Sequence, residues 1–310
     1  MPYFNRDKIR LYYETSGSGS TVIIFIHGNF ASWRWWEAQL SNLPAEYSAY
    51  APDLRGCGGS DKPESGYGID TLIGDLEAFV THTGATKFHL VGHSLGGALV
   101  QEFSCRFPEK VLSLTLVAPV PASGLAKLHD KKPATFLGHY FSPDRIFGAI
   151  SHLKMQKPLL KLGLQKSMPG SEHWKELESL VDTAANMSPF AFKGFLELLK
   201  DWRNPAPERI TCPVLLIHGK LDPVVPAGEL IPMEKQLPNC QRICWSSIGH
   251  APQMERPKAF SSLLFNFIHA TEKPEEDNAA LPLPEEEIIP SSEAVPLTQR
   301  LIQWLKKRFK

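Results

Sequence analysis

The sequence predicts an α/β protein built on an open, mostly parallel sheet. Short runs of β-branched and aliphatic residues recur along the chain and are typical of strands buried on both faces: 22–27, 88–91, 112–118, 214–219 and 241–246. Several of these runs end in a loop that places a glycine near a polar or titratable residue. In parallel sheets such loops gather at one edge, where ligands bind, so an active site is expected there.

The first of these strands ends in His27-Gly28-Asn29-Phe30. We expect His27 to brace this loop rather than to take part in chemistry. Tryptophans follow within a few residues, and Trp33 and Trp36, spaced three apart, share one face if the segment is helical. One of the three tryptophans in this run, Trp33, Trp35 or Trp36, is predicted to lie at a pocket entrance.

The second strand runs into Gly92-His93-Ser94-Leu95-Gly96, and a helical pattern follows over residues 98–107. A serine at such a strand-to-helix turn exposes its hydroxyl, and the flanking glycines leave the room that the sharp turn needs. The motif and its context together predict that Ser94 is a nucleophile. The backbone N–H of Leu95, at the start of the helix, is then one donor for an oxyanion.

A serine nucleophile needs a base and a carboxylate that orients the base. Asp222 follows the strand at 214–219 and His250 follows the strand at 241–246, so both are expected at the sheet edge that carries Ser94. The other usual place for the acid, after the strand at 112–118, offers no carboxylate. Other histidines near this edge are expected to serve the structure: His27, His93 and His218.

Residues 122–207 interrupt the strand pattern with helical stretches rich in proline and in large apolar residues. We expect a helical lid over the sheet edge, with an apolar pocket beneath it, and a sheet core formed by residues 1–121 and 208–271. The predicted pocket residues come from this segment and from the loop after residue 27: Phe30, Trp33, Trp36, Tyr140, Phe141 and Phe192.

The C-terminal tail reverses its charge along its length. Residues 272–296 hold eight acidic residues, one lysine and five prolines, which is typical of a disordered linker. Residues 297–310 hold five basic residues and no acidic one, and their apolar residues fall on one side of a helix. This pattern favours contact with an anionic membrane surface or a protein partner, and equally favours packing on the chain's own domain.

Composition excludes several function classes. The 310 residues carry 33 basic and 33 acidic side chains, so no overall charge attracts nucleic acid. The first residues lack the apolar stretch of a signal peptide, and no run approaches the roughly 20 apolar residues of a membrane span, so a cytoplasmic location is expected. No zinc-ligand spacing and no glycine-rich phosphate loop occur, so we expect neither metal nor cofactor.

The order Ser94, Asp222, His250, together with His27-Gly28, resembles the α/β-hydrolase superfamily over about residues 1–272. The stretch Asp53-Leu54-Arg55-Gly56-Cys57-Gly58-Gly59-Ser60-Asp61 is similar to a loop common among its members. The resemblance implies an eight-stranded sheet, helices on both faces and a lid inserted after the sixth strand. It also favours Asn29 over Phe30 as the second oxyanion donor, because the residue directly after His-Gly faces the pocket in that pattern.

Within that superfamily, Ser94 argues against the haloalkane dehalogenases and epoxide hydrolases, which use an aspartate at this position. The loop at 27–30 departs from the Gly-Gly-Pro-Gly-like loop typical of C–C hydrolases and prolyl aminopeptidases. We therefore predict a serine hydrolase that cleaves small carboxylic esters with an apolar portion through an acyl-enzyme. A lactonase, a C–C hydrolase or a perhydrolase with the same residues, and a ligand receptor on this fold, are the alternatives.

Overall fold

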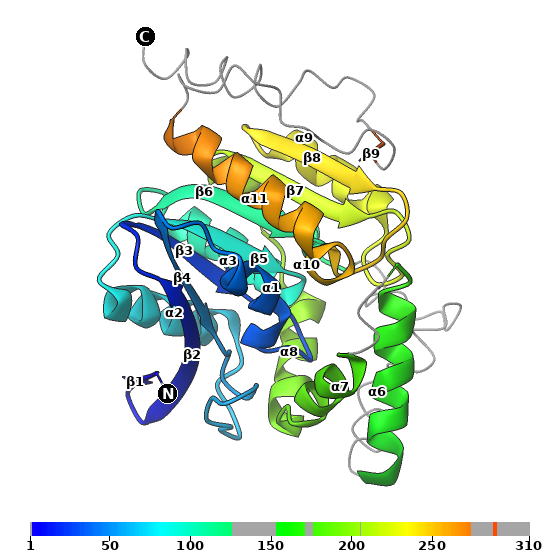
Figure 1. Cartoon of the computed structure of the whole chain (residues 1–310). Coiled ribbons are helices and arrows are strands. Elements are labelled where there is room, and N and C mark those ends of the chain that lie inside the picture. Colours follow the sequence, from blue (N-terminus) through cyan, green and yellow to red (C-terminus); the bar gives the residue numbers. More distant parts are fainter. Residues whose placement is uncertain (1, 126–152, 171–175, 205, 274–287, 290–310) are drawn as a thin grey trace.

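The centre of the molecule is one twisted sheet with helices on both faces (Figure 1). The computed structural model describes residues 2–125, 153–170, 176–204, 206–273 and 288–289. The strand order is β1-β2-β4-β3-β5-β6-β7-β8-β9. The neighbours from β4 to β8 in this order are parallel, whereas β1–β2, β2–β4 and β8–β9 are antiparallel. The strands are β1 (Tyr3–Arg6), β2 (Ile9–Gly17), β3 (Thr21–Ile26), β4 (Tyr47–Pro52), β5 (Phe88–His93), β6 (Val111–Val117), β7 (Val214–Gly219), β8 (Cys240–Trp245) and β9 (Ile288–Ile289).

The predicted fold class is confirmed: eight strands form a mostly parallel sheet, and the two-residue β9 adds an edge. The central strands are apolar runs because both of their faces are covered; all six residues of β5 and of β7 are buried. Along β3, Ile24 and Ile26 join one apolar core, while Ile23 and Phe25 join another on the opposite face.

Different helices cover the two faces. The first core receives apolar side chains from α2 (Ile69–Thr83) and α3 (Leu95–Arg106), and from α9 (Ile231–Gln236). The second core is closed by α1 (Glu37–Ser41) and by α11 (Pro257–Glu272). The loops at the carboxyl ends of the strands, including short α10 (Pro252–Glu255), therefore occupy the remaining edge.

Between β6 and β7 the described part of the chain contains helices, where the resemblance implies an insertion; we call the predicted segment 122–207 the insertion. Its described helices are α6 (Leu153–Ser167), α7 (Leu177–Ala185) and α8 (Pro189–Asp201), and they lie together at one end of the sheet (Figure 1). Apolar residues of α6 and α7 form a cluster with residues from the strand-end loops. Tyr140 and Phe141, two of the predicted pocket residues, lie outside the described residues.

The sheet core ends later than the sequence suggested. Helix α11 continues to Glu272, a residue that we assigned to the acidic linker. The Glu272 carboxylate accepts a hydrogen bond from Thr21 Oγ1 at 2.8 Å and lies 3.5 Å from His89 Nε2, so this exposed residue is attached to the sheet domain. Strand β9 also falls within the predicted linker and pairs with β8. Residues 297–310 lie outside the described part of the chain.

Among the residues that the structure describes, no helix has the length and apolarity that crossing a membrane requires.

Candidate active site

Ser94 occupies the sharp turn between β5 and α3, with φ 53° and ψ −114°. A non-glycine residue at positive φ is strained, and here the end of β6 holds it: the Ser94 N–H donates to the Val117 carbonyl at 3.0 Å. The neighbouring glycines are required by close packing. A Cβ on Gly92 would lie 2.6 Å from the Gly96 carbonyl oxygen, and one on Gly96 would lie 2.6 Å from the His27 carbonyl oxygen.

The structure brings together the three residues predicted as a catalytic triad. Ser94 Oγ lies 3.0 Å from His250 Nε2, and His250 Nδ1 lies 2.7 Å from Asp222 Oδ2. The other oxygen of Asp222 accepts the N–H groups of Val224 at 2.7 Å and Val225 at 3.0 Å, which orients the carboxylate. Because a carboxylate only accepts, the proton of neutral His250 is on Nδ1, and Nε2 is left to accept from the serine hydroxyl.

The loop after β3 packs directly against the serine turn. A Cβ on Gly28 would lie 3.0 Å from the Ser94 Cβ, so only glycine fits there. Asn29 and Phe30 follow, both partly exposed, and Phe30 has a left-handed backbone with φ 59°. The Phe30 N–H donates to Asn29 Oδ1 at 3.0 Å. This hydrogen bond already uses the N–H of Phe30, the alternative oxyanion donor. It therefore favours the N–H of Asn29 as the donor that acts together with the N–H of Leu95, the first in helix α3.

His27 and His218 are also buried, and their rings form structural hydrogen bonds. His27 Nε2 accepts from the Leu54 N–H at 3.0 Å, while Nδ1 donates to the Gly28 carbonyl at 2.8 Å. Burial lowers the pKa of His27 to about 4, so its ring is neutral at pH 7. Burial likewise lowers the pKa of His218, to about 4, and Arg242 Nη1 lies 2.9 Å from its Nε2.

His93, which precedes Ser94, is hydrogen-bonded to the backbone of His250. Its Nε2 lies 2.8 Å from the His250 carbonyl oxygen, to which it can only donate. Burial, reinforced by the nearby His250, lowers the pKa of His93 well below the usual value. A neutral His93 ring is therefore hydrogen-bonded to the backbone of the proposed base.

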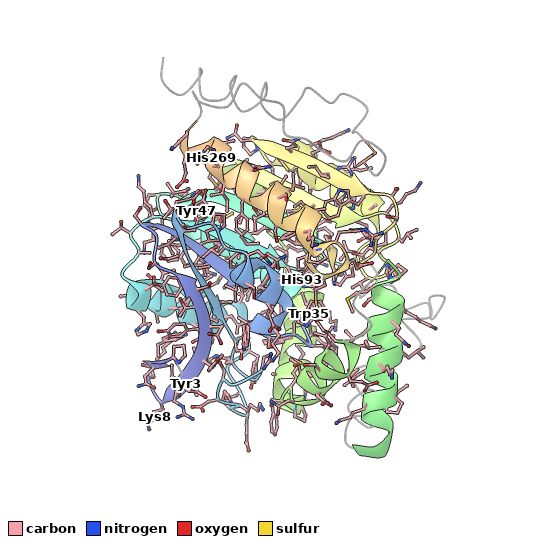
Figure 2. All side chains as sticks on the ribbon, in the orientation of Figure 1. Tyr3, Lys8, Trp35, Tyr47, His93 and His269 are labelled. Carbon is pink, nitrogen blue, oxygen red and sulfur yellow. The ribbon has the colours of Figure 1, made fainter. Side chains whose placement is uncertain are left out.

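The tryptophan segment forms a short 3₁₀ helix (Trp33–Trp36) in which Trp33 and Trp36 share a face, as predicted. That face packs on the core beneath α11, where the fully buried Trp36 ring contacts Phe25 with centroids 5.2 Å apart. Trp36 therefore belongs to the core instead of a pocket entrance. Trp35, which is not among the predicted pocket residues, faces the other way and stacks on His93 with ring centroids 5.2 Å apart (Figure 2).

Trp35 also connects the site to the helical insertion. Its ring shares an apolar cluster with Leu164 and Met168 of the α6 region and with Leu177 of α7. The same cluster contains Ala251, the residue after His250. The position of Trp35 within a Trp-Arg-Trp-Trp run was visible in the sequence, but its direction depends on how the 3₁₀ helix is seated against the sheet.

Phe30 and Phe192 form a second contact between the strand-end loops and the insertion. Their ring centroids lie 5.0 Å apart, with Phe192 on α8 nearly fully buried and Phe30 partly exposed. The aromatic pair lies beside the residues predicted to form the oxyanion donors. It supplies an apolar wall next to Asn29.

The loop that begins at Asp53, which resembles a family motif, contacts the start of the tryptophan helix. The Asp53 carboxylate accepts the N–H groups of Trp33 at 2.7 Å and Gly59 at 2.8 Å. Burial raises the pKa of Asp53 to about 6, against the lowering effect of these hydrogen bonds. Asp53 thereby ties the start of the tryptophan helix to the turn at 57–60.

Glu255 is a second residue that sequence reasoning missed. It is fully buried at the end of α10, five residues after His250, and its carboxylate accepts the N–H groups of Gly249 and Ala251. Glu255 is the only carboxylate between residues 251 and 265, but Arg256 and Lys258 stand beside it, so nothing in the sequence marks it as buried. Within the described residues, no group of three or more His, Cys, Asp and Glu side chains could hold a metal ion.

Comparison with known proteins places this arrangement among hydrolases. Residues 21–257 match the model of the alpha/beta hydrolase fold family. An uncharacterized protein of Mycobacterium tuberculosis is 26% identical over 286 residues, which cover 88% of this chain and 82% of that protein. The soluble epoxide hydrolase of a Corynebacterium strain is 33% identical over 149 residues, 46% of this chain and 51% of that enzyme.

Solved structures share the fold. An esterase from Exiguobacterium antarcticum has a TM-score of 0.72 and 23% identity, covering 84% of this chain and 96% of the esterase. The enol-lactonase from Burkholderia xenovorans has a TM-score of 0.73 and 17% identity, covering 86% of this chain and the whole of the lactonase.

Proposed function

Because the chain belongs to the alpha/beta hydrolase fold family, we propose that it is a serine hydrolase that cleaves carboxylic esters through an acyl-enzyme. One observation carries the proposal: Ser94 Oγ, the two ring nitrogens of His250 and the Asp222 carboxylate form an unbroken hydrogen-bonded chain of 3.0 and 2.7 Å. Such a chain is the arrangement that turns a serine hydroxyl into a nucleophile.

In the proposed reaction, Ser94 Oγ attacks the ester carbonyl carbon while its proton passes to His250 Nε2. Asp222 holds Nδ1–H and stabilises the imidazolium that forms. His250 then returns the proton to the leaving alcohol, which leaves an acyl group on Ser94. A water molecule, activated by the same histidine, releases the carboxylic acid.

The N–H groups of Leu95 and Asn29 are the proposed donors to the oxyanion of the tetrahedral intermediates. Leu95 N–H is the first in α3 and has no acceptor within its helix, so it is available to a ligand. The dipole of that helix adds partial positive charge at the same point. Removing one such donor costs other enzymes roughly 10² to 10³ in kcat.

The proposed substrates are small or medium esters with an apolar acyl portion. Phe30 and Phe192 supply an apolar wall, and helices of the insertion cover this edge. Lactonase, C–C hydrolase and perhydrolase activities use the same residues and are the same-site alternatives. A serine in place of aspartate argues against epoxide hydrolysis, although an epoxide hydrolase is among the relatives.

The test is a panel of p-nitrophenyl esters from acetate to palmitate, with lactones alongside. We expect turnover that is highest for short and medium acyl chains. Mass spectrometry of the intact protein, quenched during turnover of a slow ester, should find the acyl group on Ser94, and the Ser94→Ala protein should carry none. Wild-type turnover by Ser94→Ala would refute the proposal, and turnover of lactones alone would select that alternative.

A further inference from the structure

Glu255 holds the backbone on both sides of His250. Its Oε1 accepts the Gly249 N–H at 3.0 Å and the Ala251 N–H at 3.1 Å. The residue is 0% exposed, and burying a carboxylate without partners is costly, so these hydrogen bonds are what makes its position tolerable. The donors are the amides that immediately flank the proposed base.

The second oxygen of Glu255 connects the same loop to the helical insertion. Oε2 accepts the Gly170 N–H at 2.8 Å, and Gly170 lies just beyond helix α6. The contact between the two segments is tight, because a Cβ on Gly249 would come within 2.5 Å of Pro169 Cδ. One carboxylate therefore joins the His250 loop to the end of α6.

The remaining polar groups of His250 are engaged in the same assembly. Its own N–H donates to the Ser167 carbonyl, at the end of α6, at 2.7 Å. Its carbonyl accepts from His93 Nε2 at 2.8 Å. The base loop is thus held by Glu255 and the α6 end on one side and by His93 on the other.

We propose that Glu255 is a positioning residue for His250: it fixes the backbone on both sides of that histidine to the end of helix α6 and so keeps the imidazole between Ser94 and Asp222. The inference rests on the proposed function, because it assigns a role within that reaction. Glu255 touches neither Ser94 nor the ring of His250 by hydrogen bond. Its effect is on the geometry of the base.

The central test replaces one carboxylate oxygen by an amide, in Glu255→Gln. The glutamine NH₂ would face an N–H donor, either that of Gly170 or those flanking His250, so at least one hydrogen bond is lost. We expect kcat for a short p-nitrophenyl ester to fall roughly 10- to 100-fold, the size expected of a small misplacement of a catalytic group, with KM within about twofold. Glu255→Asp keeps the charge at shorter reach and should lose less.

A matched control is Asp75→Asn in α2, another buried carboxylate, which pairs with Arg55 and Arg6 in a different part of the sheet core. We expect this variant to lower the melting temperature while kcat per folded molecule stays near wild type. It separates loss of a buried carboxylate in general from loss of the one beside the base.

A readout independent of turnover is the low-field proton NMR signal of His250 Nδ1–H, which reports its hydrogen bond to Asp222. We expect Glu255→Gln to shift or broaden this signal and Asp75→Asn to leave it in place. If Glu255→Gln folds with wild-type kcat and an unchanged signal, the inference is wrong. It is also wrong if Asp75→Asn loses as much kcat. If Glu255→Gln does not fold, kcat and the NMR signal are measured on Glu255→Asp instead. The inference is then wrong if Glu255→Asp has wild-type kcat and an unchanged signal. A changed signal in a protein without esterase activity would reject the ester chemistry alone.

Discussion

The strand-end loops and the helical insertion build the two sides of the candidate site by different means. In the loops, single backbone constraints decide each position: Ser94 is held at φ 53°, and Gly28 and Gly96 allow contacts that a Cβ would prevent. In the insertion, apolar area decides, as in the packing of Phe192 on Phe30 and of α6 on Trp35.

For the proposed hydrolase, this contrast predicts that the chemistry and the choice of acyl chain depend mainly on different parts of the molecule. A change to one hydrogen-bonding atom in the loops interrupts the chain from Ser94 to Asp222. A change in the apolar part of the insertion, around Phe192, is expected to alter only the shape of an apolar wall, whose contributions are small and graded. The two regions meet at the His250 loop, where Ser167 and Gly170 contact it.

The largest effect is expected from breaking the loop side. Ser94→Ala and His250→Ala should each lower kcat by roughly 10³ or more, and Asp222→Asn should do so to a similar or smaller extent. The double variant Ser94→Ala/His250→Ala should be hardly worse than either single variant, because the residues act as one unit. Steady-state turnover of a short ester measures this. Multiplying losses in the double variant would show that the residues act independently.

A smaller effect is expected from the insertion side. Phe192→Leu keeps an apolar side chain but opens space beside Phe30, so the ratio of kcat/KM for octanoate over butyrate esters should rise roughly tenfold, with kcat for butyrate nearly unchanged. Phe190→Leu, on the same helix with 43% of its surface exposed, is the matched control and should leave the ratio as it is. If wild type, Phe192→Leu and Phe190→Leu have equal ratios, the acyl chain does not bind beside Phe192.

Two buried histidines, His27 and His218, should make the stability of the folded protein depend on pH. The pKa values of His27 and His218 are lowered to about 4 by burial, so each binds a proton in the unfolded chain at pH below about 6.5 but not in the folded one. Stability is then present above about pH 6.5 and is lost as the pH falls toward 4, by about 2 kcal/mol per histidine at about pH 5. The raised pKa of Asp53 acts in the opposite direction.

Urea unfolding at about pH 7.5 and about pH 5 measures this difference, and His218→Gln should shrink it. The glutamine oxygen can still accept from Arg242, so the variant keeps a partner while losing the titration. If both proteins lose the same free energy of unfolding between the two pH values, His218 does not contribute.

The smallest effect is expected from the tail. A chain ending at Lys273 should keep its melting temperature and short-ester turnover within about twofold, because the helix that closes the core is complete. A chain ending at Thr271 differs only by losing Glu272 and Lys273, and it should melt several degrees lower because Glu272 binds Thr21 and contacts His89. Equal melting of the two chains would show that Glu272 adds no stability.

The sequence was sufficient for the parts of the molecule that local sterics dictate. The sharp turn at Ser94 could be predicted because a serine lies between Gly92 and Gly96 after an apolar strand, and the approach of Asp222 and His250 because each follows such a strand. Trp35 and Trp36 could not be told apart, since adjacent residues of a 3₁₀ helix face different neighbours and only tertiary packing decides which.

Two further residues were hidden by composition. Glu255 looked like a surface charge because carboxylates are rarely buried, and its partners are backbone amides, which a sequence does not display. Glu272 looked like the first residue of the acidic tail, because no glycine or proline marks the helix end before Pro274. The Glu272 contacts to Thr21 and His89 are distant in the chain, whereas Glu255 combines the nearby amides that flank His250 with the distant amide of Gly170.

The long separation between Ser94 and His250 also bears on biosynthesis. The proposed nucleophile leaves the ribosome 156 residues before its proposed base, and the helix that closes the second core follows later still. A growing chain with Ser94 already exposed has neither Asp222 nor His250, so the proposed site stays chemically inert until nearly the whole core has been made. The proposed mechanism therefore predicts that a fragment ending before residue 250 has no esterase activity, and ester hydrolysis would report on completion of the sheet core.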